Sequence, residues 1–311
     1  MLKKFQFHIL MHAIIFLWGF TGILGKLIKI DALYIVWHRL WIAALSLLIV
    51  AFVFKLPRKL PKGKQLFLIC LTGLFVAGHW LTFYYSIELS TASLGILCLS
   101  TATLHVTWLE PLILKKPFSK IEFLFGFLVI FGIYFIANDF NEKEILALIV
   151  GLISALFAAV FSVMNAKLIE DTPSSVITLT ELTIGFVLVT IVLGSQGMLN
   201  ANLFKMRSTD FYLLLFLGIV CTSFAFLAMI EVVKRLGAFT ASLSINMEPV
   251  YTILLAIPLL SEDKQVGGNF YFGAGFIVFI VIANAIVKSR IKKVGLRNLE
   301  NDKKPQKNHL Q

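Results

Sequence analysis

Apolar residues dominate this chain in ten long runs, which short polar or charged segments separate. Each run holds roughly 18 to 24 mostly apolar residues, enough at about 1.5 Å per residue to cross a hydrocarbon core of about 30 Å as a helix. The runs lack the short-period alternation that is typical of membrane barrel strands. The pattern therefore predicts ten transmembrane helices, near 7–28, 33–54, 66–86, 92–114, 121–138, 145–168, 174–194, 210–231, 236–260 and 270–288.

Composition supports a membrane protein. Of 311 residues, 59% are apolar and 14% are charged, and the mean hydropathy is +0.89. Soluble domains carry about 25% charged residues. Backbone groups must pair within the chain in lipid, so we expect an all-α, multi-pass protein. We expect the first run to be retained, because it lacks a small-residue cleavage site.

The net charge of +11 follows from topology and does not indicate a nucleic-acid partner. With a cytoplasmic N-terminus and alternating spans, 21 of the 28 Lys and Arg residues fall on the cytoplasmic side and six on the other side. This positive-inside bias predicts a cytoplasmic (inner) membrane location with both termini in the cytoplasm. The basic tail at 291–311 is expected to be disordered. One basic residue, Arg39, remains inside the second span.

Four short motifs recur in the same order in the two halves of the chain. They are KLI at 26–28 and 167–169, RL at 39–40 against EL at 181–182, TASL at 91–94 and 240–243, and GFLVIF at 126–131 against GFIVFI at 275–280. Five spans per repeat is an odd number, so the second copy must enter the membrane from the opposite side. Such inverted repeats are typical of transporters that bind substrate near the midplane, where the halves meet. We expect one five-helix repeat in 1–140 and a second in 141–290.

Three motifs resemble the EamA type of the drug/metabolite transporter superfamily over roughly residues 8–288. They read WGFTGILGK, WHRLWIAAL and EPVYTILLAIPLLSE, the last at 248–262. Pro249 and Glu262 keep the family's spacing between a mid-span Pro and a later Glu, whereas Lys116 stands in the first half where the family often has Glu. The resemblance implies EamA-type repeats and transport, often export, of small metabolites such as amino acids or related compounds, in contact with membrane lipid.

Motifs of the competing classes are absent from the sequence. The GFTGILGK segment lacks the first Gly and the final Ser or Thr of a phosphate-binding loop, and there is no HExxH or GxSxG motif. Cys70, Cys98 and Cys221 have no metal-ligand spacing and are expected to be packing residues. We expect a secondary transporter of a small molecule, with no enzyme activity, cofactor or metal. A membrane-embedded enzyme, a channel or an assembly scaffold is the alternative.

Glu248 is the first candidate for a functional group. On a continuous helix from Leu236 it would lie about 18 Å deep, near the bilayer centre, where an ionisable side chain is costly. Pro249 is expected to free the carbonyl of Ile245 beside it. We interpret Glu248, with Asn246, as a site for a coupling proton or a substrate cation. The alternative is a structural carboxyl that pairs with Asn246 or with a neighbouring span.

Arg39 and Glu181 occupy equivalent positions in the two repeats, but inversion places them towards opposite faces, so no direct contact is implied. The planar guanidinium of Arg39 suits a substrate carboxylate or phosphate, and the alternative is an extended side chain that reaches the interface. Glu181 is a candidate substrate or ion ligand with a structural alternative. Glu110 and Glu231 lie near span ends beside basic residues, so we expect them to be structural.

Two histidines and two aromatic residues are candidates to line a cavity: His79, His105, Trp80 and Tyr84. Packing inside the bundle is the alternative for all four.

Trp18 is the remaining aromatic candidate, because glycines follow it at three-residue spacing. Gly19, Gly22 and Gly25 would let another backbone come close to this helix.

Overall fold

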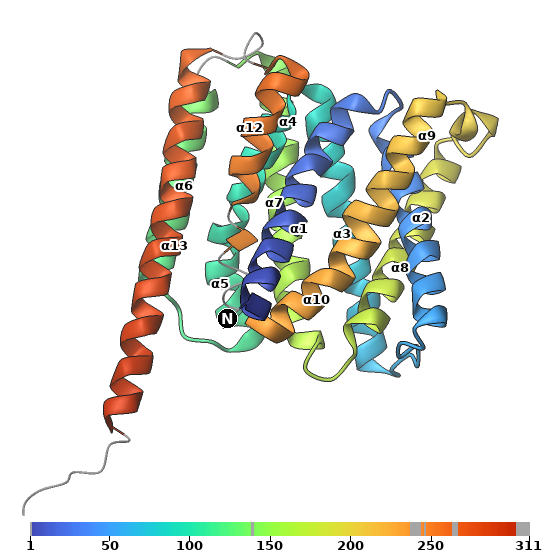
Figure 1. The fold of residues 1–311 in the computed structure, drawn as a ribbon. Helices are drawn as coiled ribbons and strands as arrows, with labels where there is room; N and C mark the ends of the chain where they lie inside the picture. The colour runs from blue at the N-terminus through green and yellow to red at the C-terminus, as the bar shows by residue number, and fades with distance from the viewer. Residues whose placement is uncertain (1, 138–139, 237–243, 246, 263–266, 303–311) are drawn as a thin grey trace, which may run out of the picture.

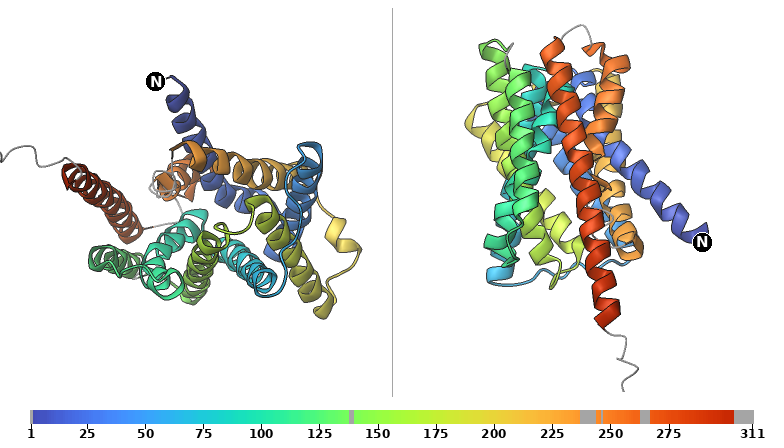
Figure 2. Two further views of the ribbon diagram at one scale, coloured as in Figure 1. Left: turned by 90° about the horizontal axis from the view of Figure 1, so that it is seen from below. Right: turned by 90° about the vertical axis from the view of Figure 1, so that its left-hand side faces the viewer.

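The computed structural model describes residues 2–137, 140–236, 244–245, 247–262 and 267–302, and within these ranges every regular element is a helix. The helices run alternately up and down in one bundle (Figures 1 and 2). In the orientation of Figure 1, we call the end at which α1 (Leu2–Leu27) begins the lower face and the opposite end the upper face. Helix α13 (Gly268–Asp302) extends beyond the lower face.

The other elements follow in chain order. In the first half they are α2 (Ala32–Val53), α3 (Lys64–Leu89), α4 (Ala92–Ser100), α5 (Ala102–Leu114) and α6 (Lys120–Ala137). In the second half they are α7 (Glu142–Leu168), α8 (Ser174–Ser195), the short η1 (Ala201–Phe204), α9 (Ser208–Leu215), η2 (Phe216–Phe224), α10 (Ala225–Leu236) and α12 (Glu248–Leu260), before α13.

Eight helical segments are long and apolar enough to cross a membrane, counted over the described ranges. Helix α12 and the apolar part of α13, Gly268–Asn284, are apolar but shorter. The expectation of an all-helical, multi-pass membrane protein is therefore confirmed. The last two of the ten expected spans stay predictions.

The span expected at 92–114 is not one continuous helix, because it is broken at Thr101 between α4 and α5. The hydroxyl groups of Thr101 and Thr103 donate to the carbonyls of Cys98 and Ser100, at 2.6 and 2.9 Å. Such local side-chain bonds compete with the helical backbone pattern. The hydropathy of the run gave no sign of this break.

The ninth span also differs from its expectation at 236–260. Residues 237–243 and Asn246 lie outside the described residues, and α12 begins only at Glu248. Pro249 is therefore in the first turn of a helix, where its missing N–H leaves no hydrogen bond broken. The expectation that Pro249 removes an intrahelical hydrogen bond is therefore wrong.

The eighth span contains a nine-residue π-helix, η2, between α9 and α10. The hydroxyl of Thr222 donates to the carbonyl of Leu217 five residues earlier, at 2.8 Å. Segments of π-helix are rare and often occur at functional sites. Here η2 lies against α2, because a Cβ on Gly218 would come within 2.5 Å of Ile42.

The main apolar core lies between α1, α2, α3, α8 and η2, with Leu40 and Leu217 fully buried within it. Large apolar side chains also cover the outside of the bundle, such as Phe127 and Phe131 on α6. An apolar exterior of this kind is expected where lipid surrounds the protein.

Candidate functional site

A cavity of about 410 Å³ lies between helices of both halves of the chain. Its walls come from α1 to α6 in the first half and from α7, α10, α12 and α13 in the second. The lining residues reach from Ser100 and Glu248, inside the bundle, down to Glu122 near the start of α6 at the lower face. The cavity therefore extends towards the lower face.

Several candidates from the sequence meet in this cavity: Trp18, Arg39, His79, Trp80, Glu248 and Pro249. Tyr84 does not line the cavity, but its hydroxyl holds the Arg39 side chain. His105 and Glu181 are not among the residues that line the cavity. Asn246 is outside the described residues.

Arg39 is buried and held by three groups from two helices, η2 and α3. Its Nε donates to Thr222 Oγ1 at 3.0 Å and its Nη1 donates to Tyr84 Oη at 3.1 Å. Its guanidinium carbon lies 3.8 Å from the centre of the Trp80 ring, within the range of a cation–π contact. With only 4% of its surface exposed, the side chain is fixed inside the bundle and does not extend to an interface.

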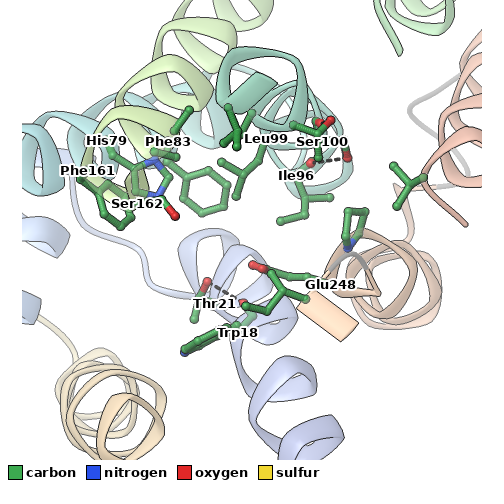
Figure 3. A pocket seen from close by; sticks show the side chains of 18 of the residues that line it. Trp18, Thr21, His79, Phe83, Ile96, Leu99, Ser100, Phe161, Ser162 and Glu248 are labelled. Carbon is green, nitrogen blue, oxygen red and sulfur yellow. Dashed lines mark hydrogen bonds between the residues drawn. The ribbon is translucent and has the colours of Figure 1, made fainter. Parts of the chain in front are cut away.

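Glu248 enters the cavity from the N-terminal end of α12, and Figure 3 shows its side chain extending into the space beside α1. Thirteen residues separate this end of α12 from the upper face, a length of about 20 Å. Arg39 lines the same cavity, yet the ion pairs found among the described residues include neither Arg39 nor Glu248. Two opposite charges thus border one cavity without neutralising each other through direct contact.

Gly19 lets α1 and α12 approach closely beside Glu248. The hydroxyl of Thr252 donates to the Gly19 carbonyl at 2.9 Å, and a Cβ on Gly19 would lie 3.0 Å from this hydroxyl and 3.2 Å from the Glu248 carbonyl. A Cβ on Gly22 would lie 3.7 Å from both Phe83 on α3 and Thr252 on α12, whereas one on Gly25 would lie 2.8 Å from the Tyr84 ring on α3. The glycine face of α1 therefore meets two helices.

His79 lies across the cavity from Glu248, next to Phe161 and Ser162 (Figure 3). Its Nδ1 lies 2.8 Å from the hydroxyl of Ser154 on α7, and this hydroxyl lies 3.0 Å from the His79 carbonyl. These contacts fix the ring at the boundary between α3 and α7.

The remaining ionisable candidates have other surroundings. Glu181 is 4% exposed and lies beside Asn165, while His105 is next to Trp108 with ring centres 6.2 Å apart. Glu110 pairs with Lys116 at 3.0 Å and Glu231 with Arg235 at 2.8 Å, as expected for structural groups near helix ends. Within the described ranges, no cluster of three or more His, Cys, Asp or Glu side chains suits a metal ion.

Sequence reasoning missed the hydroxyl and phenyl groups of the lining. Ser100 and Thr103 flank the break between α4 and α5. Phe83, Phe161 and Phe226 form an aromatic part of the cavity wall. The serine and threonine cluster at 100–103 was a usable signal, since hydroxyl side chains often bond nearby carbonyls within helices. The phenylalanines carried no signal, because 29 are spread over the chain.

Comparison with known proteins agrees with this architecture. The model of the EamA-like transporter family matches the chain twice, over residues 7–138 and 145–286. One solved crystal structure superposes with a TM-score of 0.63 over 92% of this chain and 99% of its own, at 13% sequence identity, which shows a shared fold. No curated protein matches the chain. Because the two family matches together span most of the sequence, this multi-pass membrane protein belongs to the EamA-like transporter family.

Proposed function

We propose that this protein is a secondary transporter that moves a small zwitterionic metabolite, an amino acid or a related compound, by alternating access. The observation that carries this proposal is the pair Arg39 and Glu248, two opposite charges that border one cavity without an ion pair between them. A carboxylate suits the planar guanidinium, and an ammonium group suits the carboxylate. Trp80, Phe83 and Phe161 offer an apolar wall for the rest of the molecule.

The size of the cavity is consistent with a small ligand. Its volume of about 410 Å³ falls within the range of roughly 300–1,000 Å³ that is usual for small-molecule sites. The cavity draws its walls from both repeats, which is where secondary transporters bind substrate.

The course of the chain supports inversion of the two repeats in ten spans. Helix α1 rises from the lower face, whereas α7, the first helix of the second half, descends from the upper face (Figure 1). The start of α12 at Glu248 corresponds to Leu99 in the aligned repeats, next to the break between α4 and α5. Discontinuous helices near the membrane midplane are typical of transporters with inverted repeats.

The positive-inside bias supports a cytoplasmic (inner) membrane location in which the lower face is the cytoplasmic side. The cavity would then load from the cytoplasm, as an exporter requires. Glu248 would either hold the ammonium group of the substrate or carry a coupling proton.

The test is flux through purified protein in proteoliposomes, with a panel of radiolabelled amino acids chosen from metabolites that change when cells lose the protein. Saturable, gradient-driven flux supports transport, whereas product formation would indicate an enzyme and non-saturable ion current a channel. Two analogues of the best substrate then serve as competitors: one lacks its carboxylate and the other lacks its amino group. Both should inhibit transport of the substrate poorly. Full competition by either analogue would contradict a zwitterion site.

A further inference from the structure

Glu262 joins two helices at the upper face. It is the second residue after α12 ends at Leu260, and its carboxylate oxygens accept the backbone N–H groups of Ala92 and Ser93 at 2.7 and 3.1 Å. These N–H groups belong to the first turn of α4 and have no partner within that helix. A carboxylate at this end of a helix is also favoured by the helix dipole.

The contact is buried and connects the walls of the cavity. Glu262 is 2% exposed, and it ties the upper end of α4 to the corner that follows α12. The opposite ends of these two helices carry Ser100 and Glu248, which line the cavity. Figure 1 shows α4 and α12 side by side at the upper face. Opening the cavity upwards by parting these helices would therefore break both hydrogen bonds.

In the first half, the position equivalent to Glu262 is occupied by a residue of opposite charge, Lys116. Helices α5 and α12 each end in a non-glycine residue with left-handed backbone, Lys115 at φ 56° and Ser261 at φ 52°. The next residue is Lys116 after α5 and Glu262 after α12. The lysine ammonium has only donors and pairs with Glu110 at 3.0 Å. Lys116 therefore cannot accept backbone N–H groups as Glu262 does.

We propose that Glu262 is a latch that closes the upper end of the transport path, and that its replacement by Lys116 at the lower corner biases the protein towards the state open to the lower face. This inference rests on the proposed alternating-access function. It adds a conformational bias: the two ends of the path are held with unequal strength, although the repeats are related.

The test measures access to the cavity and needs no substrate. Ser100→Cys is introduced after Cys70, Cys98 and Cys221 have been replaced by Ala, and a membrane-impermeant maleimide is applied from each side of the membrane in right-side-out and inside-out vesicles. In the parent, labelling should be fast from the lower face and slow from the upper face. Glu262→Ala should increase the rate from the upper face about tenfold, and Glu262→Gln less, because loss of a hydrogen bond to a charged group has an effect of this size.

Glu88→Gln is the matched control. Glu88 also accepts a backbone N–H at the start of a helix, from Ala32 at 3.0 Å, but it connects α3 to α2 and lies outside the cavity lining. Its replacement should leave labelling unchanged. An unchanged upper-face rate in a folded Glu262→Ala protein would overturn the latch, as would equal acceleration by Glu88→Gln, which indicates general loosening.

Flux is measured on the same preparations, so failure of the latch and failure of the proposed function are separate results. A faster upper-face rate without any flux would leave the latch in place and remove the transport proposal. Normal flux with an unchanged labelling rate would support the transport proposal and remove the latch.

Discussion

The hydroxyl of Thr222 accepts a hydrogen bond from Nε of Arg39 at 3.0 Å and donates one to the carbonyl of Leu217 at 2.8 Å. The second bond spans five residues and lies within the π-helix η2. The irregular helix of one half therefore holds the charged side chain of the other half in place.

Replacing Thr222 by Val should loosen Arg39 without changing the shape of the site. A hydrogen bond to a charged group contributes about 1.5–3 kcal/mol, so we expect KM for the best substrate to rise about tenfold while the protein stays folded. Thr222→Ser should retain wild-type KM. The control is Ser223→Ala, which removes bonds to Ser46 and Ala43 in the same segment but none to Arg39; an equal effect of this change would contradict a specific role for Thr222.

Arg39→Lys should keep the positive charge but lose the planar, two-nitrogen geometry of the guanidinium group. A lysine ammonium cannot present two nitrogens in fixed geometry to Thr222 and Tyr84, so we expect at least about tenfold weaker binding of a substrate carboxylate. Binding of the amine analogue should change little. Equilibrium binding by scintillation proximity measures both, and Arg58→Lys, in the exposed loop after α2, serves as the control; unchanged carboxylate affinity would remove Arg39 from the binding site.

Glu248→Gln separates the two roles of this carboxyl, because it keeps size and hydrogen bonding but removes titration. If Glu248 carries a coupling proton, accumulation driven by a pH gradient should be lost while substrate exchange persists. If it holds the substrate ammonium group, binding itself should fall. Both are measured in proteoliposomes with and without a pH gradient.

The comparison variant for this experiment is Glu181→Gln, a buried carboxyl outside the cavity lining. Normal binding and normal gradient-driven flux in Glu248→Gln would leave Glu248 as a structural group. Loss of pH-gradient-driven accumulation in Glu181→Gln alone would indicate that the coupling proton binds on α8.

Gly19→Ala should force α1 and α12 apart, because its Cβ would lie 3.0 Å from the Thr252 hydroxyl and 3.2 Å from the Glu248 carbonyl. Overpacking of this kind costs about 1–3 kcal/mol, so the melting temperature in detergent should fall. Gly194→Ala is the control, since its Cβ meets nothing within 4 Å near the end of α8. Equal melting temperatures for the two variants would show that the α1–α12 contact can relax freely.

Topology is tested with reporters fused to the full chain. A reporter after Gln311 should behave as cytoplasmic, and one inserted at 195–209 should behave as external, because the basic residues concentrate on the side of the chain ends. An external signal from the C-terminus would contradict the ten-span arrangement.

The sequence predicted the membrane-spanning helices because apolar length is a direct requirement of the bilayer. It also identified Arg39 and Glu248, since a charge inside a span is costly enough to require a reason. Both line the cavity. The sequence could not show that His105 and Glu181 do not line the cavity, because the direction in which a helix face points depends on its neighbours.

Other features depend on hydrogen bonds that hydropathy does not record. At the break, the Thr101 hydroxyl bonds the Cys98 carbonyl, and within the π-helix the Thr222 hydroxyl bonds the Leu217 carbonyl five residues earlier. The role of Glu262 follows from its distance to a helix that is 170 residues away in the chain. No window along the sequence contains both partners of that contact.

The interruption at Thr101 would let α5 rotate as a rigid segment about one end. Its 13 residues measure about 20 Å, so a pivot of about 15° at the interruption would carry its lower end about 5 Å sideways, within the usual scale of hinge motions. Helix α4 could stay fixed during this swing, since its own first turn is anchored to Glu262. We therefore expect the mouth of the cavity to widen or narrow through rotation of α5 alone, without translation of a whole membrane span.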